Sequence, residues 1–195
     1  MKKISNMTNI AIFASGTGTN TTNIIQYFLH SEQIRVGAIF CNSNTAKVIE
    51  RASEYNINCH IFSKEELNDK EGVYRILKEE NIDFIVLAGF LQLIPEHIIN
   101  HYNNKIINIH PALMPKFSGK GMYGMNVHKA VIEAKEKETG ITIHLVNEQY
   151  DEGAIIFQAK CQVTESDTPE SVAEKVHALE YEFFPKVIEE YINKV

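Results

Sequence analysis

The sequence predicts an α/β protein with a doubly wound, mostly parallel sheet and antiparallel strands in its C-terminal part. Short apolar runs alternate with helix-like segments over residues 10–109, a pattern typical of parallel βαβ units. The run Asp83–Gly89 is almost continuously apolar, as expected for a central strand that is covered on both faces. After residue 110, two alternating runs follow each other without a helix between them, which favours an antiparallel pair.

The apolar runs of the first half have the length of strands. They predict strands at Ile10–Ala14, Ile34–Cys41, Cys59–Phe62, Asp83–Gly89 and Lys105–Ile109. The segments between them predict helices at Asn20–Ser31, Thr45–Tyr55, Glu71–Asn81 and Pro95–Tyr102. Thr45 is expected to be an N-cap, and Pro95 suits the first turn of its helix.

The second half begins with a segment that is rich in glycine and proline. A helix is expected near Val127–Lys137, followed by strands at Ile141–Val146 and Ala154–Cys161. A last helix should run from Pro169 to about Tyr191, broken or bent near Pro185. With no internal repeat and no flexible linker, residues 1–195 are expected to form one domain.

Composition and charge narrow the class of protein. The 195 residues are 44% hydrophobic and 23% charged, as in ordinary soluble globular proteins. The formal net charge of −6 makes general nucleic-acid binding a poor hypothesis. No apolar stretch suits a signal peptide or a membrane span, so a cytoplasmic location is expected. The three widely spaced cysteines are expected to be buried free thiols.

A glycine loop joins the first strand to the first helix. Its residues Gly18, Thr19 and Asn20 combine a tight turn with polar side chains at a helix start, where unpaired N–H groups attract anions. This favours a phosphate site. The third glycine of the dinucleotide fingerprint is replaced by Thr21, so a mononucleotide phosphate fits better. A tight turn with an Asn cap is the alternative interpretation.

The stretch from Ile106 to Pro111 ends a strand with two polar residues. Asn108 and His110 are two positions apart, so their side chains should project from the same face. An amide donor beside an imidazole can bind an oxyanion, and histidine can carry a proton near neutral pH. Pro111 ends the strand. A packed or capping histidine is the alternative for His110.

A loop with three acidic residues, Asn147–Gly153, follows a strand in which Thr142 and His144 share a face. Gly153 should let this loop fold back onto the site. A solvated turn is the usual role of a single loop aspartate, so the residues alone do not select Asp151.

These features together resemble the folate-dependent phosphoribosylglycinamide formyltransferases. The similarity rests on Gly16–Asn20, on Asn108-Ile109-His110-Pro111 with Leu113-Met114-Pro115-Lys116, and on His144 with Asp151-Glu152-Gly153. The resemblance extends from Ile10 to about Ile188 and implies a Rossmann-like formyltransferase fold. It also implies transfer of the formyl group of 10-formyltetrahydrofolate to the amine of glycinamide ribonucleotide, in de novo purine biosynthesis.

The resemblance assigns roles to residues of this chain. Catalysis falls to Asn108, His110 and Asp151, and substrate binding to Gly18, Thr19, Asn20, Pro111 and Glu180. The folate contacts are Leu91, Gln92, Leu93, Ile94, Asn147 and Asp151. Residues 1–105 become a nucleotide-phosphate-binding half, and residues 106–195 a catalytic and folate-binding half. No metal is implied, and the expected partners are small molecules, with the chain a monomer or a homodimer that binds neither nucleic acid nor membrane.

The implied mechanism is a hypothesis about charge. Attack of a neutral amine on the formyl carbon creates an oxyanion, which Asn108 and protonated His110 would stabilise. Asp151 would keep the imidazole of His110 charged and help to relay the amine proton.

The chain departs from the family pattern in four places. Gln92 stands where arginine is common, Asn126 replaces a histidine, and His177 replaces a glutamine. The segment Gly119–Met125 is longer than in compact bacterial members. None of these differences falls on Asn108, His110 or Asp151.

Other functions stay open at this point. Formyltetrahydrofolate hydrolases share the three residues but usually carry an N-terminal regulatory domain, for which a first strand at Ile10 leaves no room. Methionyl-tRNA formyltransferases usually add a C-terminal domain and a basic surface. A non-catalytic nucleotide- or folate-binding module would not need the three residues together. His97 and His101, four apart on a helix, form a weak candidate metal pair because no third ligand is nearby.

Overall fold

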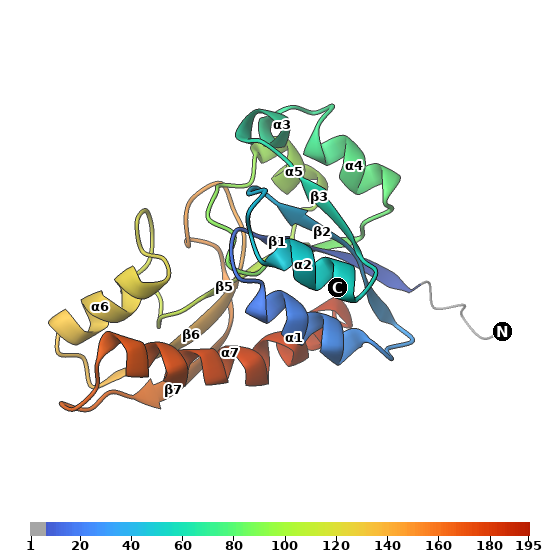
Figure 1. The fold of residues 1–195 in the computed structure, drawn as a ribbon. Helices are drawn as coiled ribbons and strands as arrows, with labels where there is room; N and C mark the ends of the chain where they lie inside the picture. Colours follow the sequence, from blue (N-terminus) through green and yellow to red (C-terminus); the bar gives the residue numbers. More distant parts are fainter. Residues whose placement is uncertain (1–6) are drawn as a thin grey trace. The chain divides into compact units, whose positions relative to one another are not determined.

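The computed structural model describes residues 7–195, and Figure 1 shows the path of the chain. The chain divides into two compact units, one ending at Ile106 and the other beginning at Ile107. Each unit is described by itself.

The first unit contains four parallel strands in the order β3-β2-β1-β4. The strands are β1 (Thr8–Ala14), β2 (Ile34–Cys41), β3 (Asn58–Ile61) and β4 (Phe84–Leu87). The helices are α1 (Thr19–Phe28), α2 (Val48–Glu54), α3 (Lys64–Asn68), α4 (Val73–Glu79) and α5 (Glu96–His101). The expected parallel part of the fold is confirmed.

Aromatic packing fills the core of the first unit. Phe13 of β1 and Phe40 of β2 are fully buried and stack with ring centroids 4.8 Å apart. Phe62 and Phe90 add edge contacts to Phe13 at 5.9 and 5.3 Å. Both follow the carboxyl end of a strand, so this cluster packs beneath the loops where ligands of open α/β sheets are usually bound.

In the first unit, one local expectation is wrong and one helix was not predicted. Helix α2 begins at Val48 with Lys47 as N-cap and no side-chain cap, so Thr45 does not cap it. The short helix α3 was not expected, although Ser63 and Glu66 form a capping box at its start. The signal is the Ser-x-x-Glu spacing that satisfies two backbone N–H groups reciprocally.

The second unit contains the antiparallel strands. Strand β5 (Ile106–His110) pairs with β6 (Glu138–Leu145), and β6 pairs with β7 (Ile155–Gln162), which ends the strand order. The helices are α6 (Met125–Glu133) and α7 (Pro169–Ile192). In Figure 1, α7 lies alongside β6 and β7. The expected antiparallel strands of the C-terminal part are therefore confirmed.

Helix α7 is long because both its start and its buried face are well specified. Thr168 accepts a hydrogen bond from the Ser171 amide in a capping box, and Pro169 occupies the first turn. The helix continues through Pro185 without a break, contrary to one of the two expected outcomes there. Burial of Phe184, Pro185 and Ile188 on the same stretch favours the continuous helix.

The three thiols agree only in part with expectation. Cys41, Cys59 and Cys161 are free, but only Cys41 is buried, because the other two lie on strands at or near a sheet edge. Burial raises the pKa of the Cys59 thiol to about 11, and the nearby Cys41 adds to the rise.

Across residues 7–195, no helix combines the length and the apolar character needed to cross a bilayer.

Candidate active site

Two cross-strand pairs place polar side chains on one face of the second unit. Asn108 of β5 lies opposite His144 of β6, and His110 lies opposite Thr142. Directly opposed residues of antiparallel strands project to the same side, so these four side chains lie side by side. The predicted convergence of Asn108 and His110 thus follows from the strand period.

The amide of Asn108 is held by two partners. Its Nδ2 atom lies 3.1 Å from His144 Nε2 and donates to Asp151 Oδ1 at 3.4 Å. His144 Nδ1 lies 2.8 Å from the Leu145 carbonyl oxygen, which can only accept, so Nδ1 carries the ring proton. In the neutral ring Nε2 is then an acceptor, and the orientation of the Asn108 amide follows from that tautomer.

The imidazole of His110 is fixed in the same way. Its Nε2 atom lies 2.7 Å from the Phe117 carbonyl oxygen, so Nε2 is the donor. Its Nδ1 atom faces Asp151 Oδ2 at 3.5 Å. His110 is only 3% exposed. In its neutral form the ring would present an unprotonated Nδ1 toward the carboxylate.

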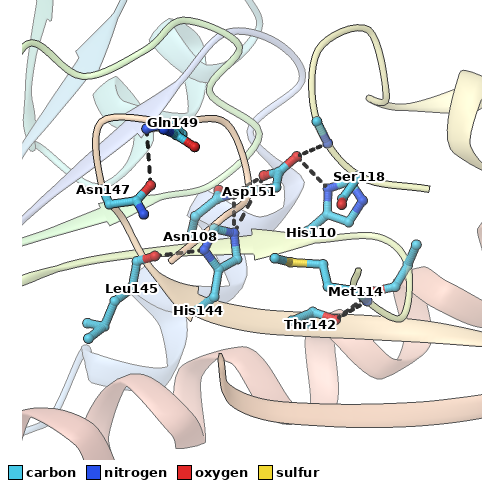
Figure 2. A network of polar contacts seen from close by, with 12 residues as sticks. Asn108, His110, Met114, Ser118, Thr142, His144, Leu145, Asn147, Gln149 and Asp151 are labelled. Atoms are coloured by element: carbon cyan, nitrogen blue, oxygen red, sulfur yellow. Dashed lines mark hydrogen bonds and ion pairs between the residues drawn. The ribbon is translucent and has the colours of Figure 1, made fainter. Parts of the chain in front are cut away.

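The carboxylate of Asp151 joins the two pairs, as Figure 2 shows. Oδ1 lies 3.4 Å from Asn108 Nδ2 and 3.5 Å from His144 Nε2. Oδ2 accepts from the Gly119 amide at 3.0 Å and faces His110. Asp151 adopts a backbone φ of 54°, in the left-handed region that aspartate tolerates better than most residues. The acidic loop thus folds back onto Asn108 and His110.

Burial and partners shift the pKa values in this cluster. Burial raises the pKa of Asp151, but its contact with His144, the nearby His110 and the Gly119 amide outweigh this effect and leave the pKa below its usual value. Burial lowers the pKa of His110 more than Asp151 and the Phe117 carbonyl raise it. The net shift of the His110 pKa is therefore downward, although Asp151 favours the charged imidazole, as the hypothesis expects.

This arrangement suits a proton transfer beside a developing negative charge. Nδ1 of His110 can accept a proton, and the resulting imidazolium would lie against Asp151. Asn108 supplies N–H groups, and its 3.4 Å bond to Asp151 is the longer of its two contacts and the easier to exchange for a ligand oxygen.

His144 was given no role in the sequence prediction. It is 2% exposed and orients Asn108. Its position on the same face as Thr142 was visible in the alternation of β6, but its pairing with Asn108 depends on the register between β5 and β6, which the sequence does not state.

Other predicted residues of the second unit lie around this face or on α7. Pro111 directly follows β5 and is half-buried, and Asn147 accepts a hydrogen bond from the Gln149 amide within the acidic loop. Glu180 is 6% exposed on α7.

The glycine loop of the first unit has the expected backbone. Gly18 has a φ of 69° and precedes the first residue of α1, Thr19. A Cβ atom on Gly18 would lie 2.6 Å from Val48 Cγ2, so the loop packs tightly on α2. The Thr22 amide bonds to the Gly18 carbonyl, leaving the N–H groups of the first turn directed outward from the helix start.

The residues predicted to contact folate differ in exposure. Leu91 and Leu93 are 48% and 41% exposed, so they offer apolar surface for a flat ring. The side-chain oxygen of Gln92 is buried and has no partner among the described residues. Ile94 is 3% exposed, so its side chain belongs to the core of the first unit.

The histidine pair on α5 packs against an aromatic ring. The hydroxyl of Tyr74 lies 3.2 Å from His101 Nδ1, and the Tyr74 ring contacts the rings of His97 and His101 edge-on. Within residues 7–195, no group of three or more metal-ligating side chains is gathered.

A cavity of about 290 Å³ lies beside the segment that carries Phe117. Ion pairs of 2.7 Å between Lys116 and Glu136 and between Lys160 and Glu138 border it. The predicted catalytic, substrate and folate residues do not line this cavity. Lys116, part of the motif that carries the family resemblance, is thus paired with Glu136.

Comparisons with known proteins identify the family of this chain. The model of the formyl transferase family matches residues 8–188. A phosphoribosylglycinamide formyltransferase of Bacillus subtilis is 34% identical, with 96% of each chain covered. A chloroplastic one of Arabidopsis thaliana is 36% identical, and the match covers 92% of this chain and 63% of that longer protein.

Solved structures show the same similarity in three dimensions. The crystal structure of phosphoribosylglycinamide formyltransferase from Bacillus halodurans superposes with a TM-score of 0.86 at 35% identity, covering 95% of this chain and 96% of that one. The enzyme from Coxiella burnetii gives 0.84 at 33% identity, covering 94% and 86%. Since the family model spans most of the sequence, the chain belongs to the formyl transferase family.

Proposed function

We propose that this protein transfers the formyl group of 10-formyltetrahydrofolate to the amine of glycinamide ribonucleotide, a step of purine biosynthesis. Relatives named as phosphoribosylglycinamide formyltransferases match this protein over nearly its whole chain. A relative in Drosophila melanogaster is named as a trifunctional purine biosynthetic protein. The observation that carries the proposal is the 3.5 Å approach of Asp151 to His110 on the face that also holds Asn108.

In this proposal His110 is the base. Its neutral Nδ1 accepts a proton from the attacking amine, and Asp151 stabilises the imidazolium that forms. Asn108 donates an N–H to the oxygen on which negative charge develops. Collapse of the tetrahedral adduct breaks the bond between the formyl carbon and the folate nitrogen. The imidazolium of His110 returns its proton to that leaving nitrogen, which gives the formylated amine and tetrahydrofolate. His144 keeps the Asn108 amide oriented throughout.

Each unit is proposed to supply binding residues. In the first unit, Gly18, Thr19 and Asn20 bind the ribonucleotide phosphate through the N-terminus of α1, and Leu91 and Leu93 contact the pterin. The backbone at Gln92 and Ile94 serves the same ring system. In the second unit, Pro111 and Glu180 contact the nucleotide, and Asn147 contacts the folate. The cytoplasmic location and the monomeric or dimeric state stay predictions.

The test is a formyl-transfer assay with purified protein. Asp151→Asn should lower turnover by roughly 10²-fold or more, since the imidazolium loses its anionic partner. Glu152→Gln, the neighbouring acid on the same loop, is the matched control and should retain wild-type turnover. Circular dichroism checks that both variants are folded.

Three acceptors separate the competing activities. Formylation of glycinamide ribonucleotide supports the proposal, whereas release of formate with water as acceptor indicates a hydrolase. Formylation of methionyl-tRNA indicates the third enzyme class. Wild-type turnover in folded Asp151→Asn would remove that residue from the mechanism.

A further inference from the structure

The hydroxyl of Thr142 forms hydrogen bonds that hold the segment after β5 in place. Thr142 Oγ1 accepts from the Met114 amide at 3.0 Å and donates to the Ala112 carbonyl at 2.7 Å. Thr142 has no exposed surface. A hydroxyl has one proton and two lone pairs, and a bond from Gln158 Nε2 at 2.8 Å fills the remaining lone pair. The proton and both lone pairs of this hydroxyl are thus all engaged in hydrogen bonds within the protein.

Gln158 completes this anchor from the next strand. Its Nε2 atom also donates to the Met114 carbonyl at 3.1 Å, so both backbone polar groups of Met114 are held. His110, Thr142 and Gln158 are aligned across β5, β6 and β7, because His110 pairs with Thr142 and Thr142 pairs with Gln158. The anchor therefore sits in the same cross-strand row as the proposed base.

The anchored segment returns to the site three residues later. The Phe117 carbonyl accepts from His110 Nε2 at 2.7 Å, and the Gly119 amide donates to Asp151 Oδ2 at 3.0 Å. Phe117 and Gly119 have positive φ values of 53° and 92°. Their carbonyl and amide groups thus depend on a backbone path that the anchor at Met114 constrains.

We propose that Thr142 and Gln158 are positioning residues for His110. By fixing the backbone at Met114, they keep the Phe117 carbonyl on His110 Nε2, which leaves the basic lone pair on Nδ1 beside Asp151. This inference rests on the proposed function for its catalytic consequence. The tautomer of His110 can be tested without any substrate.

The structure offers a matched pair of substitutions. Thr142→Val removes a hydroxyl with three bonds, whereas Thr139→Val, on the same strand, removes a hydroxyl that is equally buried and has no partner among the described residues. Thr142→Ser retains the hydroxyl and serves as the rescue. Gln158→Leu covers the case in which Thr142→Val does not fold, because Gln158 is an exposed residue of β7.

Two measurements distinguish positioning from a merely structural role. Nitrogen-15 NMR of the labelled imidazoles in the substrate-free protein should show the proton of His110 on Nε2 in wild type, Thr139→Val and Thr142→Ser. Thr142→Val and Gln158→Leu should lose this fixed tautomer. Their kcat should fall on the order of 10-fold to 100-fold, with a much smaller change in KM for glycinamide ribonucleotide.

The pH dependence of kcat gives a further test, because the direction of its shift is predicted. The Phe117 carbonyl raises the pKa of His110, so its loss should move the acid limb of kcat to lower pH in Thr142→Val and Gln158→Leu. The other groups that act on this ring are Asp151, His144 and His128. All three are unchanged in these variants.

The outcomes separate the two proposals. A folded Thr142→Val or Gln158→Leu protein with the wild-type tautomer and an unmoved acid limb overturns the positioning role. An equal shift in Thr139→Val also overturns it. Absence of formyl transfer in the wild type overturns the proposed function alone, because the NMR comparison still decides whether the anchor sets the state of His110.

Discussion

At the scale of single residues, burial of His128 on α6 makes the free energy of unfolding depend on pH. Its ring is 2% exposed, and its Nδ1 atom has no partner among the described residues. Burial, followed by the charges of His177 and His110, lowers the pKa of His128 to about 4. Between pH 6.5 and pH 4 the unfolded chain therefore binds a proton that the folded chain does not.

The free energy of unfolding should accordingly fall as the pH is lowered through this window. The slope from His128 is about 1.4 kcal/mol per pH unit, or about 3 kcal/mol in total. Above the unfolded pKa the contribution is constant. Urea unfolding of wild type and His128→Gln at about pH 5 and about pH 7 measures the difference. Parallel pH slopes in the two proteins would contradict this account.

The sequence predicts part of the site for a clear physical reason. Asn108 and His110 share a face because side chains alternate along any strand. Asp151 could be singled out only by resemblance, since its approach depends on a left-handed backbone and on contacts more than 40 residues away. The downward direction of the His110 pKa could not be predicted, because burial outweighs the carboxylate partner and the sequence does not report burial.

At the scale of elements, the N-cap of α7 should contribute measurably to stability. The Thr168 hydroxyl accepts from the Ser171 amide at 3.3 Å, and the Ser171 hydroxyl accepts in return from the Thr168 amide at 3.0 Å. Thr168→Ala should lower the free energy of unfolding by about 1 kcal/mol. Thr45→Ala is the control, because Thr45 is exposed and caps no helix. Chemical denaturation compares them, and equal losses would argue against the cap.

Prediction of the elements succeeded where the pattern was long. Strand β2 has the predicted bounds, Ile34–Cys41, because its apolar run is long and flanked by polar residues. Helix α3 was not predicted, because its five residues show no helical period. Its capping box is the signal that indicates it. Helix α6 begins two residues earlier than expected, at Met125, because Gly124 with a φ of 53° sets its start. Backbone conformations of this kind are decided by contacts beyond the local sequence.

At the scale of the whole molecule, substrate binding should stabilise the folded chain. At about 100 times its Kd, glycinamide ribonucleotide should add about 2.7 kcal/mol, seen as a higher Tm. Gly18→Ala should lose this shift, because Gly18 has a φ of 69° and a Cβ atom there would meet Val48. Gly16→Ala, with open space around its Cβ position, is the control. Equal Tm shifts in the two variants would contradict phosphate binding by this loop.

The strand order ends at β7, and this position bears on how the protein behaves at high concentration. An edge strand can recruit a strand from another molecule and so begin aggregation. Lys160, 60% exposed near the middle of the β7 side-chain row, places a charged group where an incoming strand would have to bury it. Lys160 is therefore expected to disfavour pairing of this edge with a strand of another copy when the protein is concentrated.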